Sequence, residues 1–341
     1  MRLRILIATD AWTPQINGVV ITLQNTIRGL ESAGQTVQTI GPDRFASIAC
    51  PTYPEIRLAL GPARGIAAIF EGFAPDAVHI ATEGPIGIAM RKLCLRHAFP
   101  FTTAYHTRFP EYVHARTRLP TALTYAWLRR FHSAAKAVMV ATAGVHDELA
   151  RRGFANLVRW SRGVDTTLFR PGPQLRNDWT RPVFMYVGRV AVEKNIDAFL
   201  ALDLPGTKVV VGDGPERESL AKRHPTAVFT GAKVGAELAA HFRSADVFVF
   251  PSRTDTFGLV MLEAIACGTP VAALRVPGPL DVVRHQESGV LDDDLRSAAL
   301  AALSLDRDTV RRHAAAFSWD DATAQFLAHL HPRRGRRDRA A

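Results

Sequence analysis

Short apolar runs alternate along this chain with longer amphipathic stretches, and the alternation begins afresh near the middle. In the first half the runs lie at 4–10, 36–42, 76–82, 99–106 and 137–142. In the second half they lie at 182–189, 207–214, 227–231, 246–252 and 269–276. Strand-length runs that alternate with helical segments are typical of parallel sheets with helices on both faces. The pattern therefore predicts two α/β doubly wound units of similar size.

Turn-forming residues mark the joint between the two units. The segment 166–180 contains a Pro-Gly-Pro turn, and Pro182 follows shortly after it. Such residues gather in loops and linkers between folded segments. The chain has 341 residues, and a domain commonly has roughly 100–200, so two domains are expected. We place an N-terminal domain at 1–168, a linker at 169–181 and the start of a C-terminal domain at 182.

The composition is that of an ordinary globular protein, with 47% apolar and 22% charged residues. No apolar run reaches the roughly 20 residues that a membrane-spanning helix needs. The N-terminal MRLRILIATDAW has two arginines before an apolar run, as a signal peptide does. That run is short, ends at Asp10 and lacks a small-residue cleavage site, so a buried strand fits better. Three cysteines without metal or redox spacing indicate buried side chains of a cytosolic protein: Cys50, Cys94 and Cys267.

The net charge is +10, from 42 basic and 32 acidic side chains. Part of this charge lies in the C-terminal stretch 332–341, PRRGRRDRAA, which has five arginines and one aspartate. We expect this stretch to be a disordered basic tail. A basic surface of this kind suits nucleic acid or anionic lipid. The alternative is a solvated tail without a partner.

An acid–glycine–acid stretch follows one predicted strand of the second unit. In PSRTDTFGLVMLEAIACG, residues 251–268, Asp255 and Glu263 stand with seven residues between them. The later part is typical of a helix that ends at a glycine, so amides near Gly258 lack intrahelical partners and suit an anion. A nucleotide sugar fits such a site, because its hydroxyls donate to carboxylates while its diphosphate lies over the amides. The alternative is that Asp255 caps the helix and Glu263 lies on the surface.

A second polar loop follows the first strand of the second unit. The stretch YVGRVAVEKN, residues 186–195, places Arg189 and Lys194 at the end of that strand. Two cations can clamp a diphosphate and neutralise a leaving group. Because ligands of such sheets bind at the carboxyl ends of the strands, we expect both loops to serve one ligand. The alternative is a solvated basic loop.

The commonest nucleotide-binding fingerprints are absent from the sequence. No G-x-G-x-x-G follows the first strand, and GDGPE at 212–216 does not supply one. No Walker A pattern occurs either. A plain dinucleotide dehydrogenase and a P-loop enzyme are therefore disfavoured.

Several stretches together resemble the retaining glycosyltransferases of family GT4, which have the GT-B fold. In the second half these are RGVDTTLFRP, VGRVAVEKN, GDGPE, FTG and FVFPSRTDTFGLVMLEAIACGTPVAA. In the first half TDAWTPQINGVVITL, PDAVHIATEGPIG and AYHTRFPEY look like the acceptor domain, and the terminal FSWDDATAQFL resembles the closing helix. The resemblance covers nearly the whole chain. It implies two Rossmann-like domains facing a cleft: an acceptor-binding domain at 1–168, a donor-binding domain at 182–312, and a helix at 313–331 that crosses back to the first domain.

The resemblance also implies roles for individual residues. Arg189 and Lys194 hold the donor diphosphate, Glu263 accepts hydrogen bonds from ribose hydroxyls, and Asp255 lies near the donor sugar. The family usually has glutamate where this chain has Asp255, which is one methylene shorter, so its contact with the sugar stays open. His106 is implied near the reacting centre; the alternative is a histidine that caps a strand end. The other donor-binding residues implied are Gly18, Lys233, Val234, Phe257, Gly258, Leu259 and Val260.

The same resemblance implies the chemistry. Transfer proceeds with retention by a front-face displacement, in which the leaving phosphate helps to deprotonate the acceptor hydroxyl. The co-substrate is a UDP- or GDP-hexose, and no cofactor is expected. No metal ion is expected either, because Arg189 and Lys194 neutralise the diphosphate and the first unit has no Asp-x-Asp at a strand end.

The acceptor is expected to be a membrane lipid or a lipid-linked glycan. INGVVITL and YHTRFPEYV look like the glycolipid-making branch, which includes sulfolipid synthase and mannosyltransferases. The stretch 123–136 mixes Trp127 and Phe131 with Arg129 and Arg130, as a helix on an anionic membrane does. Its alternative is a helix packed on the core with a solvated basic face. We expect a cytoplasmic protein, peripheral at the inner face of the membrane.

Three other functions compete with this one. The first is the same enzyme class with a soluble acceptor. The second is a nucleic-acid-binding protein, suggested by the charge, but the aromatic–basic interleaving of single-strand binders is absent and no nucleic acid partner is expected. The third is a GT-B epimerase or phosphorylase, which the formation of a glycosidic product from a nucleotide sugar would exclude.

Overall fold

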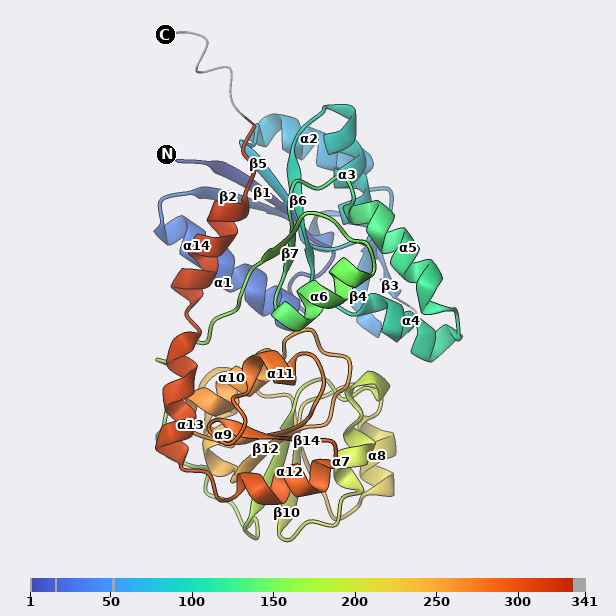
Figure 1. Ribbon diagram of the computed structural model, residues 1–341. Coiled ribbons are helices and arrows are strands. Elements are labelled where there is room, and N and C mark those ends of the chain that lie inside the picture. Colours follow the sequence, from blue (N-terminus) through green and yellow to red (C-terminus); the bar gives the residue numbers. More distant parts are fainter. Residues whose placement is uncertain (1, 16, 51–52, 334–341) are drawn as a thin grey trace. The chain divides into compact units, whose positions relative to one another are not determined.

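The computed structural model describes residues 2–15, 17–50 and 53–333 (Figure 1). These residues form two compact units. One holds the chain up to Ser161 together with the part from Trp319 on, and the other is Arg162–Ser318. Each unit is built on a six-stranded parallel sheet, so the two α/β doubly wound units predicted from the alternation are confirmed. The domain boundaries at 168 and 181 remain predictions.

The sheet of the first unit is buried on both faces. Its strands lie in the order β2 (Thr36–Ile40), β1 (Arg4–Ala8), β5 (Ala77–Ile80), β6 (Phe101–Tyr105), β7 (Val138–Val140) and β8 (Leu157–Arg159). Leu6 and Ala8 pack into one apolar core, whereas Ile5 and Ile7 pack into a second core on the other face. Strand side chains alternate between faces, so an uninterrupted apolar run marks a strand covered on both sides.

One helix of the first unit comes from the far end of the chain. Phe326 of this helix, α14 (Trp319–His329), shares an apolar core with Leu23 and Leu30 of α1 (Gly18–Ser32), and Figure 1 shows the two side by side. Gln325 also accepts a hydrogen bond from the backbone N–H of Ser161 at 2.8 Å. The other helices of this unit are α2 (Ala63–Phe73), α3 (Pro85–Arg96), α4 (Phe109–Thr117), α5 (Thr121–His132), α6 (Ala143–Arg151) and the 3-10 turn η1 (Pro42–Arg44).

The second unit repeats the same architecture. Its strands lie in the order β11 (Val228–Gly231), β10 (Thr207–Val211), β9 (Val183–Val187), β12 (Val247–Phe250), β13 (Val271–Leu274) and β14 (Gly289–Asp292). Its helices are α7 (Ile196–Leu200), α8 (Arg217–Arg223), α9 (Gly235–Ser244), α10 (Leu259–Ala266), α11 (Pro279–Val282), α12 (Leu295–Ala302) and α13 (Arg307–His313), with 3-10 turns η2 (Val192–Lys194) and η3 (Ala314–Ala316).

The strand order reverses once in each sheet. In the first unit β1 lies between β2 and β5, and in the second unit β9 lies between β10 and β12. The helical crossovers on the two sides of such a point run over opposite faces of the sheet. A crevice opens there beside the carboxyl ends of the strands, and ligands of open α/β sheets bind in it. The loops after β1, β5, β9 and β12 are therefore the first places to look for a site.

Several details differ from the sequence-based expectation. An antiparallel hairpin, β3 (Ser47–Cys50) and β4 (Tyr53–Ala59), was not predicted, nor were the edge strands β8 and β14. The strands β3, β8 and β14 have only three or four residues each, so their sequence signal is weak, and β4 contains a proline, which is uncommon in strands. Cys94 and Cys267 are buried as predicted, but Cys50 lies on the hairpin and is only partly buried. The strands also end before the apolar runs do, since their last residues turn into loops.

The helix α5 combines both alternatives considered for the stretch 123–136. Leu128 and Phe131 are buried, so one face of the helix packs on the core. Trp127 is 41% exposed, and Arg129 and Arg130 are exposed as well. Of the two aromatic side chains considered for membrane insertion, Phe131 is buried and cannot insert, whereas Trp127 is partly exposed and can.

After α14 the chain continues to Arg333. The backbone N–H of Arg333 donates to the carbonyl oxygen of Asp76 at 2.7 Å, and its guanidinium lies 5.5 Å from the ring centre of Phe99. The rest of the predicted basic tail, 334–341, lies outside the described residues. Within the described part of the chain, no helix combines the length and the apolarity needed to cross a membrane.

Candidate active site

Two neighbouring strands of the second unit deliver most of the predicted site residues. β9 and β12 pair side by side where the strand order reverses. The loop 188–195 follows β9 and carries Arg189 and Lys194, and the loop 251–258 follows β12 and carries Asp255. Because both strands are parallel, both loops leave the sheet at the same edge.

The two loops are joined by an ion pair between Lys194 and Asp255. The Lys194 Nζ lies 2.6 Å from Asp255 Oδ1, and the two side chains are only 18% and 16% exposed. A second link comes from Asn195, whose side-chain N–H donates to the carbonyl oxygen of Pro251 at 3.1 Å. The helix α10 begins after Gly258 and not after Asp255, so the alternative in which Asp255 caps the helix is wrong.

Gly258 starts α10 in a conformation that favours glycine. Its φ is +84°, in the left-handed region, and a Cβ here would lie 2.7 Å from Met261 Cε and 3.1 Å from Phe250 Cζ. Having no side chain, Gly258 cannot cap the amides of the first helical turn as a serine or aspartate does. Leu259 and Val260 form that first turn and are half-buried. The turn has the geometry that the sequence-based prediction of an anion site requires, and that site stays a prediction.

Glu263 lies one turn further along α10 and is buried. It is 8% exposed, so the alternative in which it is a surface residue is wrong. Its Oε2 atom is buried without a hydrogen-bond partner among the described residues. Burial raises the pKa of this carboxyl to about 7, since an apolar environment disfavours the charged form. A buried carboxyl oxygen without a partner costs free energy, and this cost is relieved when a ligand donates to it.

The remaining residues predicted in this unit follow the same edge of the sheet. Arg189 is half-buried after β9, and its carbonyl oxygen accepts from the Tyr186 hydroxyl at 2.9 Å. Lys233 follows β11 and pairs with Glu237 of α9 at 2.6 Å. Val234 is 58% exposed at the start of α9. The structure brings Lys194 and Asp255 into contact, and it places Arg189, Lys233 and Val234 in segments that follow strands at the same edge of the sheet.

A third loop supports the site, and the sequence analysis did not identify it. Gly278 follows β13 with φ +96°, and a Cβ here would lie 2.7 Å from the carbonyl oxygen of Asp255. The loop 275–279 therefore packs directly on the acid–glycine–acid stretch. Next to it, Phe257 is buried and its ring lies edge-on to Phe317 at 6.2 Å. A Pro-Gly-Pro turn after a strand was the available signal for this loop.

Two predicted site residues lie in the first unit. His106 follows β6, is half-buried, and its ring packs edge-on against Trp160 at 5.6 Å. Gly18 is exposed and begins α1, whose N-cap Asn17 accepts from the amides of Val19 and Val20. Both residues follow carboxyl ends of strands of the first unit, as predicted.

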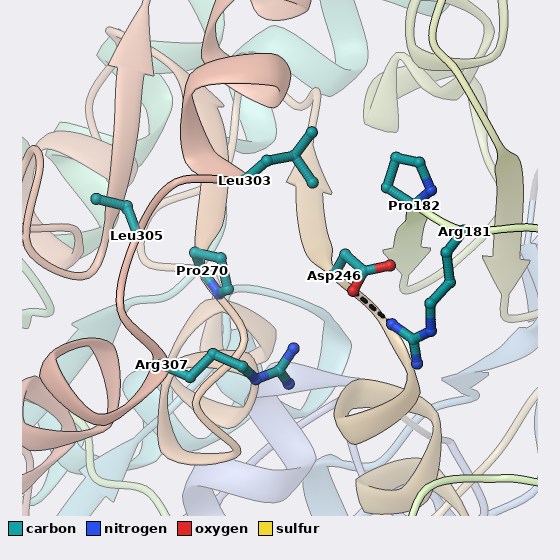
Figure 2. A pocket seen from close by; sticks show the side chains of 7 residues that line it. All are labelled: Arg181, Pro182, Asp246, Pro270, Leu303, Leu305 and Arg307. Atoms are coloured by element: carbon teal, nitrogen blue, oxygen red, sulfur yellow. Dashed lines mark hydrogen bonds and ion pairs between the residues drawn. The ribbon is translucent and has the colours of Figure 1, made fainter.

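A cavity of about 320 Å³ lies at the opposite edge of the second sheet (Figure 2). Its lining residues come from the segments before β9, β12 and β13 and from the link between α12 and α13: Arg181, Pro182, Asp246, Pro270, Leu303, Leu305 and Arg307. Arg181 pairs with Asp246, and Arg307 donates to the carbonyl oxygen of Ala245 at 2.9 Å. The polar groups thus bond to one another at the amino ends of the strands. This cavity is not the predicted site.

Comparison with known proteins assigns the chain to a family. The family described as Glycosyltransferase Family 4 matches residues 16–168, and Glycosyl transferases group 1 matches residues 181–307. A GDP-mannose-dependent alpha-mannosyltransferase of Mycobacterium tuberculosis is 31% identical, over 98% of this chain and 98% of that protein. The chain belongs to glycosyltransferase family 4. It is therefore an enzyme that transfers glycosyl groups, and the family predicted from the sequence is confirmed.

Other members of glycosyltransferase family 4 and similar folds extend this comparison. Sulfoquinovosyl transferase SQD2 of Arabidopsis thaliana is 30% identical, over 80% of this chain and 60% of that protein. Among solved structures, sucrose-phosphate synthase from Thermosynechococcus elongatus matches with a TM-score of 0.79 at 21% identity, over 96% of this chain and 98% of that one. Anabaena HepE in complex with UDP-glucose matches with a TM-score of 0.71 at 14% identity, over 96% and 99%. The predicted GT-B fold is confirmed.

Proposed function

We propose that this family 4 glycosyltransferase moves a hexosyl unit from a nucleotide diphosphate sugar to an acceptor hydroxyl, with retention of configuration. The observation that carries the proposal is the buried Glu263 carboxyl, whose Oε2 has no partner among the described residues. It belongs to the same α10 whose first turn follows Asp255 and Gly258. A ribose diol donates two hydrogen bonds and would satisfy such a carboxylate.

The other residues of this edge suit the remaining parts of the donor. Lys194 and Arg189 bind the diphosphate and neutralise the charge that develops on the leaving group. The amides of Phe257 to Val260 line the phosphates and the sugar. The loop with Lys233 and Val234 takes the base. These assignments make 182–312 the donor-binding domain and 1–168, which contains His106, the acceptor-binding domain.

Asp255 gives the donor site a feature that bears on specificity. The shorter side chain already pairs with Lys194 at 2.6 Å. An incoming diphosphate competes for this lysine, and its arrival frees the Asp255 carboxylate to accept a hydrogen bond from the donor sugar. Replacing Asp255 by the longer glutamate usual in the family should therefore change the preference among donor sugars more than the affinity for the nucleotide alone.

The chemistry follows from one displacement. The bond between the sugar C1 and the diphosphate oxygen breaks, and a bond from the acceptor oxygen to C1 forms on the same face. The acceptor proton passes to the leaving phosphate oxygen, so the products are a glycoside and a nucleoside diphosphate. Lys194 and Arg189 stabilise the departing diphosphate, and His106 is assigned to the acceptor-binding unit.

GDP-mannose is the first donor to test. The relatives that match over nearly the whole chain are named GDP-mannose-dependent alpha-mannosyltransferases, and a further relative is named a GDP-mannose-dependent phosphatidylinositol dimannoside mannosyltransferase. These names also support a lipid acceptor. UDP-hexoses are the second class of donor to test, since the site chemistry at the ribose and the diphosphate is common to both.

The donor assignment is tested with a panel of GDP-, UDP- and ADP-sugars, measuring binding, hydrolysis and transfer. Lys194→Ala and Glu263→Ala should each lower transfer by at least about ten- to hundredfold in a folded protein, because each removes a charge-assisted contact worth about 1.5–3 kcal/mol. Lys222→Ala, an exposed lysine on α8, is the matched control and should behave as the wild type. Near-normal turnover in either site variant would overturn the donor site.

The acceptor side includes a surface suited to an anionic membrane. Phe109, Leu123 and Trp127 are 45%, 63% and 41% exposed, and the rings of Phe109 and Trp127 lie 6.5 Å apart. Leu123 and Trp127 stand four residues apart on α5, and Arg130 follows three residues later, so these side chains share one helix face. Each arginine near an anionic surface contributes about 1 kcal/mol, and the apolar side chains add burial. We propose peripheral attachment at the cytoplasmic face.

Liposome sedimentation tests this surface separately from the donor site. Three proteins are compared: the wild type, a truncation after His331, and a variant with Leu123→Ser, Trp127→Ser and Arg130→Ala. Loss of binding to anionic liposomes in the surface variant alone supports the proposal. Loss in the truncation alone assigns membrane binding to the basic tail. If the wild type does not bind, a soluble acceptor becomes the leading alternative.

A further inference from the structure

A second carboxylate site lies in the first unit, at the end of β5. Glu83 follows this strand, which pairs with β1 where the strand order reverses. Its Oε1 lies 3.2 Å from Nε2 of His132, and Nδ1 of His132 lies 2.8 Å from Oγ1 of Thr103. His132 is 1% exposed and Thr103 is fully buried. Thr103, His132 and Glu83 thus form a hydrogen-bonded chain that runs from the buried core to one carboxylate.

The direction of these hydrogen bonds follows from their chemistry. An ionised carboxylate only accepts, so Nε2 of His132 carries the proton that is donated to Glu83. In the neutral ring Nδ1 then accepts from the Thr103 hydroxyl. The ring itself is held by packing, with Phe131 at 5.1 Å and Phe154 at 6.0 Å between ring centres. His132 therefore fixes the orientation of Glu83 from the buried side.

The backbone of Glu83 is held just as firmly. Asp10 accepts from the Thr82 hydroxyl at 2.8 Å and from the Ile86 amide at 2.8 Å, and its own amide donates back to Thr82 at 2.6 Å. A Cβ at Gly84 would lie 2.5 Å from the Asp10 carboxyl carbon, so only glycine allows this approach. Asp10 thus ties down the residues on both sides of Glu83.

The two carboxylates of this edge are used differently. Asp10 is buried, and both of its carboxylate oxygens accept hydrogen bonds from protein groups. The Glu83 side chain is 20% exposed, and among the described residues His132 is its one hydrogen-bonding partner. A carboxylate with two oxygens can accept about four hydrogen bonds. One oxygen of Glu83 is therefore oriented by the protein and the other is left to solvent or to a ligand.

We propose that Glu83 binds a hydroxyl group of the acceptor, and that His132 and Thr103 are positioning residues for it. The proposal rests on the proposed function, since it names the acceptor contact of that transfer. Glu83 follows β5 and His106 follows β6, which pairs with it, so both lie at one edge of the same sheet. A carboxylate repels an anion and accepts from hydroxyls, so the group bound here is a neutral polyol: a sugar, inositol or glycerol head group.

Glu83→Gln is the central variant, because it keeps the size of the side chain and removes the charge. With the donor that the panel identifies, transfer is measured to phosphatidylinositol vesicles, diacylglycerol vesicles and octyl mannoside, which separates lipid head groups from a soluble glycoside. The loss of a charge-assisted hydrogen bond predicts a fall in kcat/KM for the acceptor of about ten- to hundredfold. Donor binding and donor hydrolysis by water should stay within about twofold. Glu71→Gln, an exposed glutamate on α2, is the matched control.

His132→Phe tests the positioning role, with thermal unfolding measured alongside. If His132 acts through Glu83, the His132→Phe substitution should raise the acceptor KM and leave the donor KM unchanged. In the double variant it should add little to the effect of Glu83→Gln. A purely structural role would change stability and both KM values together. Thr103→Val should give a smaller effect in the same direction.

The outcomes separate this proposal from the donor site. If the wild type hydrolyses no nucleotide sugar, the proposed function fails. If the wild type transfers and Glu83→Gln transfers equally well to each acceptor, the proposed function stands and the Glu83 assignment is wrong. If the wild type hydrolyses the donor but glycosylates none of the three polyols, the acceptor class and the Glu83 assignment are both wrong.

Discussion

Asp10, Asp255 and Glu263 show how three carboxyl groups in one chain are handled differently. Burial raises the pKa of Asp10, and its hydrogen bonds from Thr82 and the helix α3 amides oppose that rise. Asp255 is paired with a lysine. Glu263 has neither compensation in the described residues, and burial alone raises its pKa to about 7. An uncompensated group of this kind is a mark of a functional site, and it can be tested through its pH dependence.

The free energy of unfolding should depend on the ionisation of the Glu263 carboxyl. Its pKa lies near 7 in the folded protein, above its ordinary value of 4.5, so the folded state keeps a proton that the unfolded chain loses. Its contribution to the stability is therefore lost progressively as the pH rises from about 4.5 to about 7, and is constant above that. Glu263→Gln should gain stability over the wild type, on the order of 3 kcal/mol at pH 8 and close to none at pH 4.5. Urea unfolding at several pH values measures this, and a difference that does not change with pH would contradict it.

Nucleotide binding should depend on the same group. Ribose hydroxyls donate to the ionised carboxylate, so binding of GDP or UDP favours deprotonation of Glu263 and releases a proton below about pH 7. The affinity should rise as the pH increases through this range. Calorimetry in two buffers of different ionisation enthalpy counts the released proton. Glu263→Gln should abolish the release, and an equal release in this variant would assign the proton to another group.

Activity should persist in EDTA. The reason is that, in the proposed site, Lys194 and Arg189 would supply the positive charge at the donor diphosphate. Transfer is measured after dialysis against the chelator and again after addition of Mg²⁺ or Mn²⁺. Loss of activity that either metal restores would show that a cation carries the diphosphate instead.

At the level of secondary structure, α10 and the loops around it hold the proposed donor site. The helix begins at Gly258, whose positive φ lets the chain turn from β12 into the helix over a short distance. The loop with Gly278 packs on the other side of the same stretch. Both approaches are too close for a Cβ, so the local geometry depends on glycine at two separate places in the sequence.

Gly258→Ala should weaken donor binding as well as stability. The left-handed conformation costs about 1–2 kcal/mol for alanine, and the new Cβ would lie 2.7 Å from Met261 Cε and 3.1 Å from Phe250 Cζ. Gly34→Ala is the matched control, since Gly34 has φ +78° and nothing within 4 Å of a Cβ. Gly34→Ala should lower the stability only by the free energy of the left-handed backbone conformation, and it should leave the donor affinity unchanged. Thermal unfolding and donor titration compare them, and equal effects of both variants on donor affinity would argue against a site at Gly258.

At the level of the whole molecule, the chain passes from the first unit to the second and then returns. The return ends in α14, whose Phe326 is fully buried against residues of α1. A Cβ at Gly29 of α1 would lie 2.3 Å from Oγ1 of Thr323, which shows how closely the two helices approach. The last helix of the chain is therefore part of the core of the first unit.

Phe326→Ala should destabilise the first unit by about 3–5 kcal/mol, the usual cost of removing a buried phenylalanine side chain. Hydrogen exchange should accelerate in β1 and β5 and change little in β9 and β12. Phe199→Ala, which removes a fully buried ring from the core of the second unit, should give the opposite pattern. If Phe326→Ala accelerated exchange in both sheets equally, the two units would unfold together and the division would not be a thermodynamic one.

The sequence by itself determined the two α/β units and the family, because apolar runs and glycine stops record local backbone structure and burial on both faces of a sheet. It also placed the residues of the proposed donor site at strand ends. Only the tertiary structure decided which of these residues meet. Lys194 and Asp255 are 61 positions apart, and Glu83 and His132 are 49 positions apart, so their pairing depends on strand order and helix packing. The same holds for Phe131, Trp127 and Glu263: local periodicity gives each a helix face, but which face is buried depends on the elements that pack against it.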